Sequence, residues 1–388
     1  MDTATYTITR NAGMDVCIVR GLLDSPSIVQ YADRIADGLR AYRPHIHVSE
    51  FRPPSPSGLP LGRIGRGAAA QVIRHGWYPK HVKRVDADVA HITDHVHAYL
   101  LRRLPARRTV VTCHDLTTFV YPENITETSL FPALTRSVFK RSLNALHHAA
   151  CVVAVSENTK RDILAYSRCT PDQVRVIYHG IDHDFTDSAD SLRVSDFRRR
   201  HAREGARLLL HVGLNTPYKN VETVLRVVHM LNTQTGAQVR LVKVGQDFTP
   251  AQAKLIHDLQ LAEKVVHLGR LDRAELVAAY QSCDALLFPS IYEGFGWPPL
   301  EAMACGLPVV ASTAPALSEI LGDAAILREA RDVGGLAASI HSLFSNENTR
   351  RDFISKGLKR ARSFSWQRSI SQLVQVYEEV AKLAPAHL

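Results

Sequence analysis

Two glutamates, Glu293 and Glu301, flank a glycine-bearing loop within residues 288–306. Carboxylates are strong hydrogen-bond acceptors, which makes such a pair suited to the hydroxyl groups of a sugar or a ribose. Gly294 and Gly296 lie between them and let backbone N–H groups come close to a ligand. Because a helix start after the loop would add free N–H groups and a positive dipole end, the segment also suits a phosphate.

A strand, a turn and a short helix are the elements that would position these groups. Residues 285–288 are apolar throughout, which is typical of a strand buried on both faces. Pro299 is expected in the first turn of the following helix, and Gly306 is placed to end it. Glu293 then lies in the loop and Glu301 in the first turn, so both can reach one ligand. The alternative is that Glu301 only favours the helix N-terminus and that Glu293 is a solvated turn residue.

Other polar side chains follow further strand-like runs, and they comprise Asp94 and His95, His114 and Asp115, and Lys219. Ligands bind at the carboxyl ends of parallel strands, so we expect these groups to border one cleft. Asp94 and His95 are the weaker candidates. For His114 the alternative is a histidine that only satisfies loop carbonyls, and Asp115 either orients it or caps the next helix.

The order of these elements predicts an α/β protein of two doubly wound domains, because short apolar runs alternate with helical stretches. The strands are expected at 16–19, 89–92, 108–112, 151–155, 174–178, 208–212, 238–244, 265–267, 285–288 and 308–311. Helices are expected at 29–42, 134–148, 221–232 and 370–381. Residues 51–78 are rich in proline and glycine, and we expect an irregular insert there, either an acceptor-side loop or a flexible connection.

The segment from Glu293 to Val310 reads EGFGWPPLEAMACGLPVV. It closely resembles the signature of the family 4 retaining glycosyltransferases, E-G-F-G-x-P-x-x-E-A-M-A-x-G-x-P-V-V. The resemblance extends over nearly the whole chain and is strongest at residues 172–327. It implies the GT-B fold, in which two Rossmann-like domains face each other across a cleft. The acceptor-binding domain would comprise residues 1–183 and the returning helix at 370–388, and the nucleotide-sugar domain residues 205–369.

The resemblance also implies roles for the residues of this segment. Glu293 would contact hydroxyls of the transferred sugar, and Glu301 would bind the ribose. The backbone of Gly294, Phe295 and Gly296 would meet the sugar and the diphosphate. The family generally uses neither a metal nor another cofactor, so positive groups and the helix end would neutralise the leaving diphosphate.

A second matching stretch, residues 211–220, is similar to the family's strand, loop and helix that grip the diphosphate, with Gly213 in its loop. Lys219 fits the family's lysine, but Tyr218 stands where an arginine is usual. Arg270 is a candidate substitute, with an exposed structural arginine as the equal alternative. The backbone around Leu268 would lie against the nucleotide base. By the same resemblance, His114 would contact the transferred sugar and support catalysis together with Glu293 and Lys219.

These features predict a hexosyltransferase that moves a sugar from a nucleotide diphosphate to an acceptor hydroxyl with retention of the anomeric configuration. The segment around His114 and Asp115 and the loop with Pro298 and Pro299 are similar to those of bacterial mannosyltransferases of surface-polysaccharide assembly. GDP-mannose is therefore the first donor considered, UDP-hexoses are the second, and the acceptor is a glycan or a lipid-linked compound. A sugar-nucleotide epimerase and a non-catalytic nucleotide-binding partner are the rival interpretations.

Charge and composition limit the partners and the location. The 388 residues carry a formal net charge of +9, which favours an anionic partner, and no RNA-binding motif or zinc finger points to nucleic acid. The chain has no apolar run of about 18 residues and no apolar signal-peptide region at its start, so we expect a cytoplasmic protein. Six scattered cysteines fit reduced core thiols. Basic residues could rest on the inner face of an anionic membrane, or form a solvated face: Arg102, Arg103, Arg107, Arg108, Arg136, Lys140 and Arg141.

Overall fold

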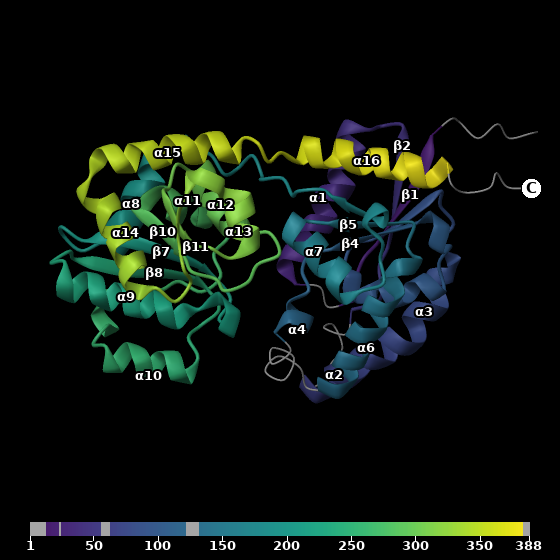
Figure 1. Ribbon diagram of the computed structural model, residues 1–388, viewed down its shortest axis with the longest axis horizontal. Coiled ribbons are helices and arrows are strands. Elements are labelled where there is room, and N and C mark those ends of the chain that lie inside the picture. Colours follow the sequence, from purple (N-terminus) through teal and green to yellow (C-terminus); the bar gives the residue numbers. More distant parts are fainter. Residues whose placement is uncertain (1–12, 23–24, 56–62, 122–131, 383–388) are drawn as a thin grey trace, which may run out of the picture.

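The computed structural model describes residues 13–22, 25–55, 63–121 and 132–382, and their strands form two parallel six-stranded sheets with helices on both faces (Figure 1). The first sheet has the order β2-β1-β3-β4-β5-β6. Its strands are β1 (Met14–Val19), β2 (Ile46–Phe51), β3 (Val89–Ile92), β4 (Thr109–Cys113), β5 (Cys151–Ala154) and β6 (Val174–Val176). The second has the order β12-β11-β10-β7-β8-β9. Its strands are β7 (Arg207–Gly213), β8 (Val239–Gly245), β9 (Val265–His267), β10 (Ala285–Phe288), β11 (Val309–Ser312) and β12 (Ile326–Arg328).

The helices follow the strands in alternation. Those before β7 are α1 (Pro26–Tyr42), α2 (Arg63–Val72), α3 (Tyr78–His81), α4 (Thr117–Val120), α6 (Pro132–Ala145), α7 (Glu157–Tyr166) and α8 (Ser191–His201). Those after β7 are α9 (Val221–Gln234), α10 (Pro250–Asp258), α11 (Arg273–Ser282), α12 (Trp297–Ala304), α13 (Pro315–Leu321), α14 (Val333–Ser345), α15 (Glu347–Ala361) and α16 (Trp366–Lys382). Two 3₁₀ segments follow strand ends, η4 (His95–Arg102) after β3 and η8 (Pro217–Lys219) after β7. The α/β class with two doubly wound sheets is confirmed.

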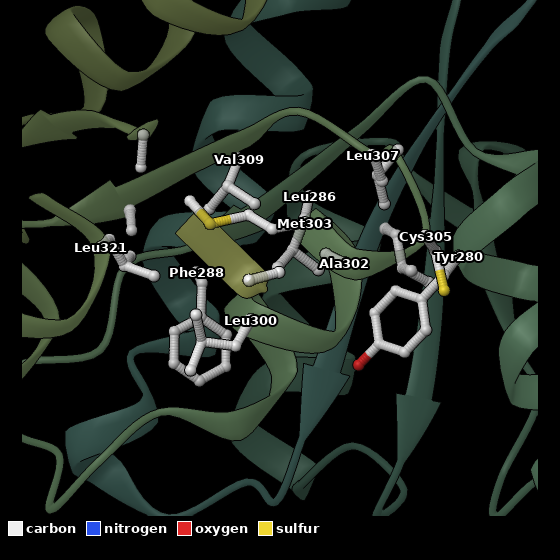
Figure 2. Close-up of a cluster of buried hydrophobic side chains, with 14 of the residues drawn as sticks. Tyr280, Leu286, Phe288, Leu300, Ala302, Met303, Cys305, Leu307, Val309 and Leu321 are labelled. Carbon is white, nitrogen blue, oxygen red and sulfur yellow. The ribbon is translucent and has the colours of Figure 1, made fainter. Parts of the chain in front are cut away.

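Each sheet is buried on both faces, which explains the continuous apolar strands. In the second sheet, one core lies between β10, β11 and the helices α11 and α12, as Figure 2 shows with Phe288, Leu300 and Met303 packed together. The opposite face packs against α9 and α14. In the first sheet, one face is covered by α1 together with α16, although α16 comes last in the chain.

The chain crosses between the two halves twice, and the crossings lie side by side. Ile181 in the first crossing forms a parallel bridge with Ser365 in the second, and its N–H donates to the carbonyl oxygen of Phe364 at 3.1 Å. After the second crossing α16 runs back along the first half, as the yellow helix in Figure 1 shows. The final helix therefore belongs to the core of the first sheet.

Three expectations about local structure need correction. Residues 63–81 are mainly helical, as α2, a π-helical turn and α3, although an irregular insert was expected; residues 56–62 lie outside the described part. The run of three alanines at 68–70 favours helix once the prolines have ended. Strands β2 and β12 were not expected. In α12, Glu301 is the fifth residue and lies beyond the first turn, because the helix begins at Trp297.

Candidate active site

A lysine and a glutamate from two neighbouring strand ends form an ion pair at the centre of the candidate site. The ammonium nitrogen of Lys219, in η8 after β7, lies 2.6 Å from Oε1 of Glu293, in the loop after β10. Both side chains are largely buried, at 13% and 10% exposure. Burial opposes the charge of Lys219, but the Glu293 carboxylate outweighs it and holds the pKa of the lysine above its ordinary value. Lys219 therefore stays charged at neutral pH.

Tyr218, which stands where the resembling family usually has an arginine, lies beside this pair. The ammonium nitrogen of Lys219 lies 5.5 Å from the centre of the Tyr218 ring and 5.3 Å from that of Phe288. The main-chain oxygen of Tyr218 accepts a hydrogen bond from Ile291 N–H at 2.7 Å, which joins η8 to the loop after β10. Arg270 is exposed after β9, and β8 lies between β9 and β7 in the sheet. The structure does not bring Arg270 to the Lys219–Glu293 pair.

Glu301 forms a second, separate buried group. Its Oε2 accepts a hydrogen bond from the hydroxyl of Tyr280 on α11 at 2.8 Å. Burial raises the pKa of Glu301 to about 7, although the Tyr280 hydrogen bond and the charge of Arg273 act in the opposite direction. Figure 2 shows the Tyr280 ring inside the apolar core near Cys305. Neutral pH therefore lies within the titration range of Glu301.

The glycine loop lies directly against the first half of the molecule. A Cβ atom on Gly294 would lie 1.9 Å from the main-chain oxygen of His114, so no larger residue fits there. The carbonyl oxygen of Gly294 accepts a hydrogen bond from the Ser156 hydroxyl at 2.7 Å. Gly296 has φ +95 at the N-cap of α12, a conformation that favours glycine. The loop after β10 and the loop after β4 thus border one site.

His114 is held in place by its surroundings. Its Nε2 lies 2.8 Å from the carbonyl oxygen of Thr93, which can only accept, so we assign the proton to Nε2. Its ring contacts Tyr31 edge-on at 4.8 Å and stacks on His179 at 5.4 Å between centroids. Burial lowers the pKa of His114, although Asp94 acts against this shift. The neutral imidazole leaves Nδ1 as a hydrogen-bond acceptor.

The three acceptor-side candidates have local roles in the fold. Asp94 caps η4, since its Oδ1 accepts from Val96 N–H at 3.1 Å, and it lies 3.1 Å from Nδ1 of His95. Burial alone would raise the pKa of Asp94, but the neighbouring histidines hold it well below its usual range. Asp115 accepts a hydrogen bond at 2.8 Å from the N–H of Thr117, the first residue of α4. Asp94 and His95 are buried, whereas Asp115 is half-buried.

The remaining candidates are Gly213, Leu268 and Phe295. Gly213 ends β7 and pairs in register with Gly245 at the end of β8. Leu268 packs on the core of the second sheet, and its N–H donates to the carbonyl oxygen of Lys243 at 3.0 Å. Phe295 is buried between the halves, 4.9 Å from the His179 ring.

Sequence reasoning missed three residues at this site, Tyr280, Ser156 as a contact between the two halves, and Lys243. Ser156 also caps α7, by accepting from Thr159 N–H at 3.0 Å, so its helix-capping pattern concealed the second contact. Within the described residues no group of His, Cys, Asp and Glu side chains could hold a metal ion. All six cysteines are free and buried, and burial raises the pKa of Cys305 to about 12.

Known proteins identify this arrangement. Residues 27–185 match the model of Glycosyltransferase Family 4, and residues 194–360 match that of Glycosyl transferases group 1. Sucrose-phosphate synthase from Thermosynechococcus elongatus superposes with a TM-score of 0.73 at 19% identity, covering 96% of this chain and all of that one. WaaG, a glycosyltransferase involved in lipopolysaccharide biosynthesis, superposes with a TM-score of 0.68 at 16% identity over 96% of this chain and all of its own. The fold is GT-B, and the two halves of the chain belong to the families of these two glycosyltransferase models.

Two relatives carry more specific names. The O-antigen chain mannosyltransferase B of Escherichia coli is 28% identical over 289 residues, which span 72% of each chain. The MMP alpha-(1->4)-mannosyltransferase of Mycolicibacterium hassiacum is 32% identical over 238 residues, 60% of this chain and 55% of its own length. The match thus spans only about half of the second relative.

Proposed function

We propose that this glycosyltransferase transfers mannose from GDP-mannose to a hydroxyl group of a glycan or lipid-linked acceptor in polysaccharide biosynthesis. The Lys219–Glu293 pair beside the glycine loop is the observation that carries the proposal, because it places a cation and a carboxylate where diphosphate and sugar would meet. The names of the two mannosyltransferase relatives support the choice of sugar.

Each charged group of the site has a proposed task. Lys219 and the N-terminus of α12 would stabilise the charge that develops on the leaving diphosphate. Glu293 would hold hydroxyls of the mannose, and Glu301 the hydroxyls of the ribose. His114, neutral and anchored through Nε2, would contact the sugar from the opposite side of the cleft. Retention would follow from attack on the face that the phosphate leaves, with a phosphate oxygen taking the acceptor proton.

A panel of donors tests the proposal. Purified protein is incubated with GDP-mannose, UDP-glucose or no donor, and nucleotide release and thermal shift are measured with and without a glycan acceptor. We expect acceptor-dependent release of GDP. Release of UDP instead would indicate that the donor is a UDP-hexose. Conversion of the donor without acceptor would indicate an epimerase, and thermal shift without turnover would indicate a non-catalytic binder.

Full activity in EDTA is also expected, because Lys219 and the N-terminus of α12 are proposed to stabilise the charge of the diphosphate in place of a metal ion.

The role of Glu293 is tested by Glu293→Ala, with Glu329→Ala as the matched control because Glu329 is exposed. Loss of a group that acts mainly on the reacting sugar should lower turnover roughly 100-fold, while GDP affinity stays nearly unchanged. Unchanged turnover would refute this role.

We also propose that the acceptor is presented at a membrane surface. No helix in the described part of the chain is both long and apolar enough to span a bilayer. Exposed basic side chains on α6 and around η4 would instead rest on anionic lipid; they are Arg102, Arg103, Arg107, Arg136, Lys140 and Arg141. Sedimentation with anionic liposomes should fall at high salt, whereas a solvated face would not sediment at either salt concentration.

A further inference from the structure

One lysine in the second half of the molecule is completely buried. Lys243, on β8, is 0% exposed, and its ammonium group donates to main-chain carbonyls rather than to solvent. The acceptors are the oxygens of Gly213 at 2.8 Å, Gln246 at 3.1 Å and Val244 at 3.3 Å. Burying an ammonium group is costly unless hydrogen bonds compensate it. The three carbonyl oxygens that converge on this nitrogen provide that compensation.

The carbonyls belong to two strand ends that touch each other. Gly213 ends β7 and Gly245 ends β8, and the two glycines are paired in register. A Cβ atom on Gly245 would lie 2.3 Å from the Gly213 oxygen, and Gly245 has φ +111, so only glycine fits. Lys243 binds this same oxygen of Gly213. The ammonium group therefore fixes both strand ends at their point of contact.

From this point the chain leads directly to the Lys219–Glu293 pair. The loop after Gly213 is fastened to the loop after β8 through Asn215, whose N–H donates to Oε1 of Gln246 at 3.2 Å. Lys219 N–H then donates to the Thr216 oxygen at 2.9 Å to close η8. The position of Lys219 thus depends on where the Gly213 end of the loop is held.

The same strand position supports a second part of the site. The carbonyl oxygen of Lys243 accepts from Leu268 N–H, and Gly245 N–H donates to the Gly269 oxygen at 2.7 Å. Those residues form the loop that is expected to lie against the nucleotide base. Main chain and side chain of Lys243 therefore contact both loops of the proposed nucleotide pocket.

We propose that Lys243 is a positioning residue for donor binding, in which the buried ammonium group holds the loops after β7, β8 and β9 in the arrangement that receives the nucleotide diphosphate. The inference rests on the proposed function, since it takes this edge of the sheet as the donor site. Lys243 acts through Gly213 and Gln246 and does not itself touch the donor. A buried positive charge beneath the loops also favours the anionic diphosphate.

Replacement of Lys243 by methionine tests the proposal, because methionine keeps the apolar stem and removes the donors. Lys254→Met is the matched control, since Lys254 lies on α10 with an exposed side chain paired to Asp258. In Lys243→Met we expect the KM for GDP-mannose and the Kd for GDP to rise roughly 10- to 100-fold, with the acceptor KM unchanged. Hydrogen exchange at residues 213–219 and 245–248 should accelerate. Lys254→Met should match the wild type in all four.

The pH dependence of GDP binding gives a second test. Burial lowers the pKa of Lys243 to about 8, although the exposed Asp247 acts against the shift. Its ammonium group loses a proton, and one donor, as the pH rises through this value. Lys219 stays charged in this range because its pKa is raised, and burial together with Lys243 lowers the pKa of His211 to about 3. Glu301, with a pKa of about 7, is largely ionised above about pH 8 and changes little beyond it. GDP affinity should therefore fall between about pH 8 and about pH 9, and this fall should be absent in Lys243→Met.

The proposal is overturned if Lys243→Met binds GDP like the wild type, or if donor and acceptor KM rise together with a general loss of stability. If the variant does not fold, a wild-type GDP affinity that is constant between about pH 8 and about pH 9 overturns it equally. A wild type that binds neither GDP nor UDP contradicts the proposed function first, and the donor role of Lys243 with it. GDP binding that is indifferent to Lys243 contradicts only the role of this lysine.

Discussion

At the scale of single residues, Glu301 combines a proposed binding role with a cost to stability. Burial raises its pKa to about 7 in the folded protein, whereas an exposed glutamate titrates near 4.5. Between these values the folded state binds more protons than the unfolded state, so stability falls as the pH rises through this window. The full effect is present above pH 7 and corresponds to roughly 3 kcal/mol, since each pKa unit amounts to about 1.4 kcal/mol.

Glu301→Gln is therefore expected to raise the melting temperature at about pH 8 and to change it little at about pH 5, where the buried glutamate is already neutral. The same substitution should weaken GDP binding about tenfold or more at pH 8, because an amide is a poorer acceptor for ribose hydroxyls than a carboxylate. Calorimetric melting and GDP titration at both pH values provide the measurements. A stability difference that does not depend on pH would show that Glu301 is not the group that titrates.

Tyr280 allows a second prediction about the same carboxyl. Its hydroxyl donates to Glu301 and lowers the pKa of that group, against the larger effect of burial. In Tyr280→Phe the pKa of Glu301 should rise further, so more of the protein holds a neutral Glu301 at pH 7. We expect a higher donor KM at pH 7 that recovers toward the wild-type value at about pH 9. A KM increase of equal size at both pH values would instead indicate a packing defect.

The sequence predicts the motif residues of the site better than their partners. Glu293, Glu301 and the glycines occur within one short segment, so their spacing is visible without a fold. Tyr280 lies 21 residues before Glu301 in a different helix, and in sequence it resembles any aromatic core residue. Lys243 interrupts an apolar strand in the way that a surface lysine would. Only the contacts between elements reveal what these two residues do.

At the scale of elements, ten strand predictions succeeded because those segments are rich in apolar and β-branched residues. The two missed strands, β2 and β12, both lie at sheet edges. In β2 the apolar residues alternate with His47, Ser49 and Glu50, and β12 has only three residues. The other two edge strands, β6 and β9, were predicted because valine dominates both, so the polar residues of β2, and not its edge position alone, weakened the signal.

The N-terminus of α7 is an element whose contacts join the two halves. Ser156 caps the helix and donates to the Gly294 oxygen in the glycine loop after β10. The carboxylate of Glu319, on α13, accepts from the N–H groups of Glu157 at 2.7 Å and Asn158 at 3.1 Å. A negative charge is favourable at a helix N-terminus, so the second half completes a cap of the first. Contact between the two halves and stability of α7 are thereby coupled.

Ser156→Ala should lower both stability and catalysis, because one hydroxyl caps α7 and binds the glycine loop after β10. We expect a loss of about 1 kcal/mol in the free energy of unfolding together with a lower kcat/KM for the donor. Asn346→Ala is the matched control, since Asn346 caps α15 in the same way, through Thr349 N–H at 3.0 Å, far from the cleft. It should lose similar stability and keep its kinetics. Equal kinetic losses in both variants would make the effect one of folding alone.

At the scale of the whole molecule, one buried carboxylate connects both halves and the final helix. Asp182, in the first crossing, is only 1% exposed at its side chain. Its oxygens lie 2.7 Å from Nε of Arg34 on α1 and 2.9 Å from a guanidinium nitrogen of Arg273 on α11. The indole N–H of Trp366, at the start of α16, donates to it at 2.8 Å. The relative position of the sheets is thus fixed where the chain passes between them.

Asp182→Asn should loosen this connection without removing either core. The substitution deprives two arginines of their partner, and because both are about one-third exposed, the loss should be near 2 kcal/mol, below that of a fully buried pair. We expect a melting temperature lower by several degrees and, in small-angle X-ray scattering without donor, a larger radius of gyration as the halves move apart. Asp187→Asn, at an exposed position five residues later, should match the wild type in both measurements. If Asp182→Asn kept the wild-type radius of gyration while melting earlier, the carboxylate would stabilise the linker locally, and the arrangement of the halves would depend on the contacts of α7 and α13 across the cleft.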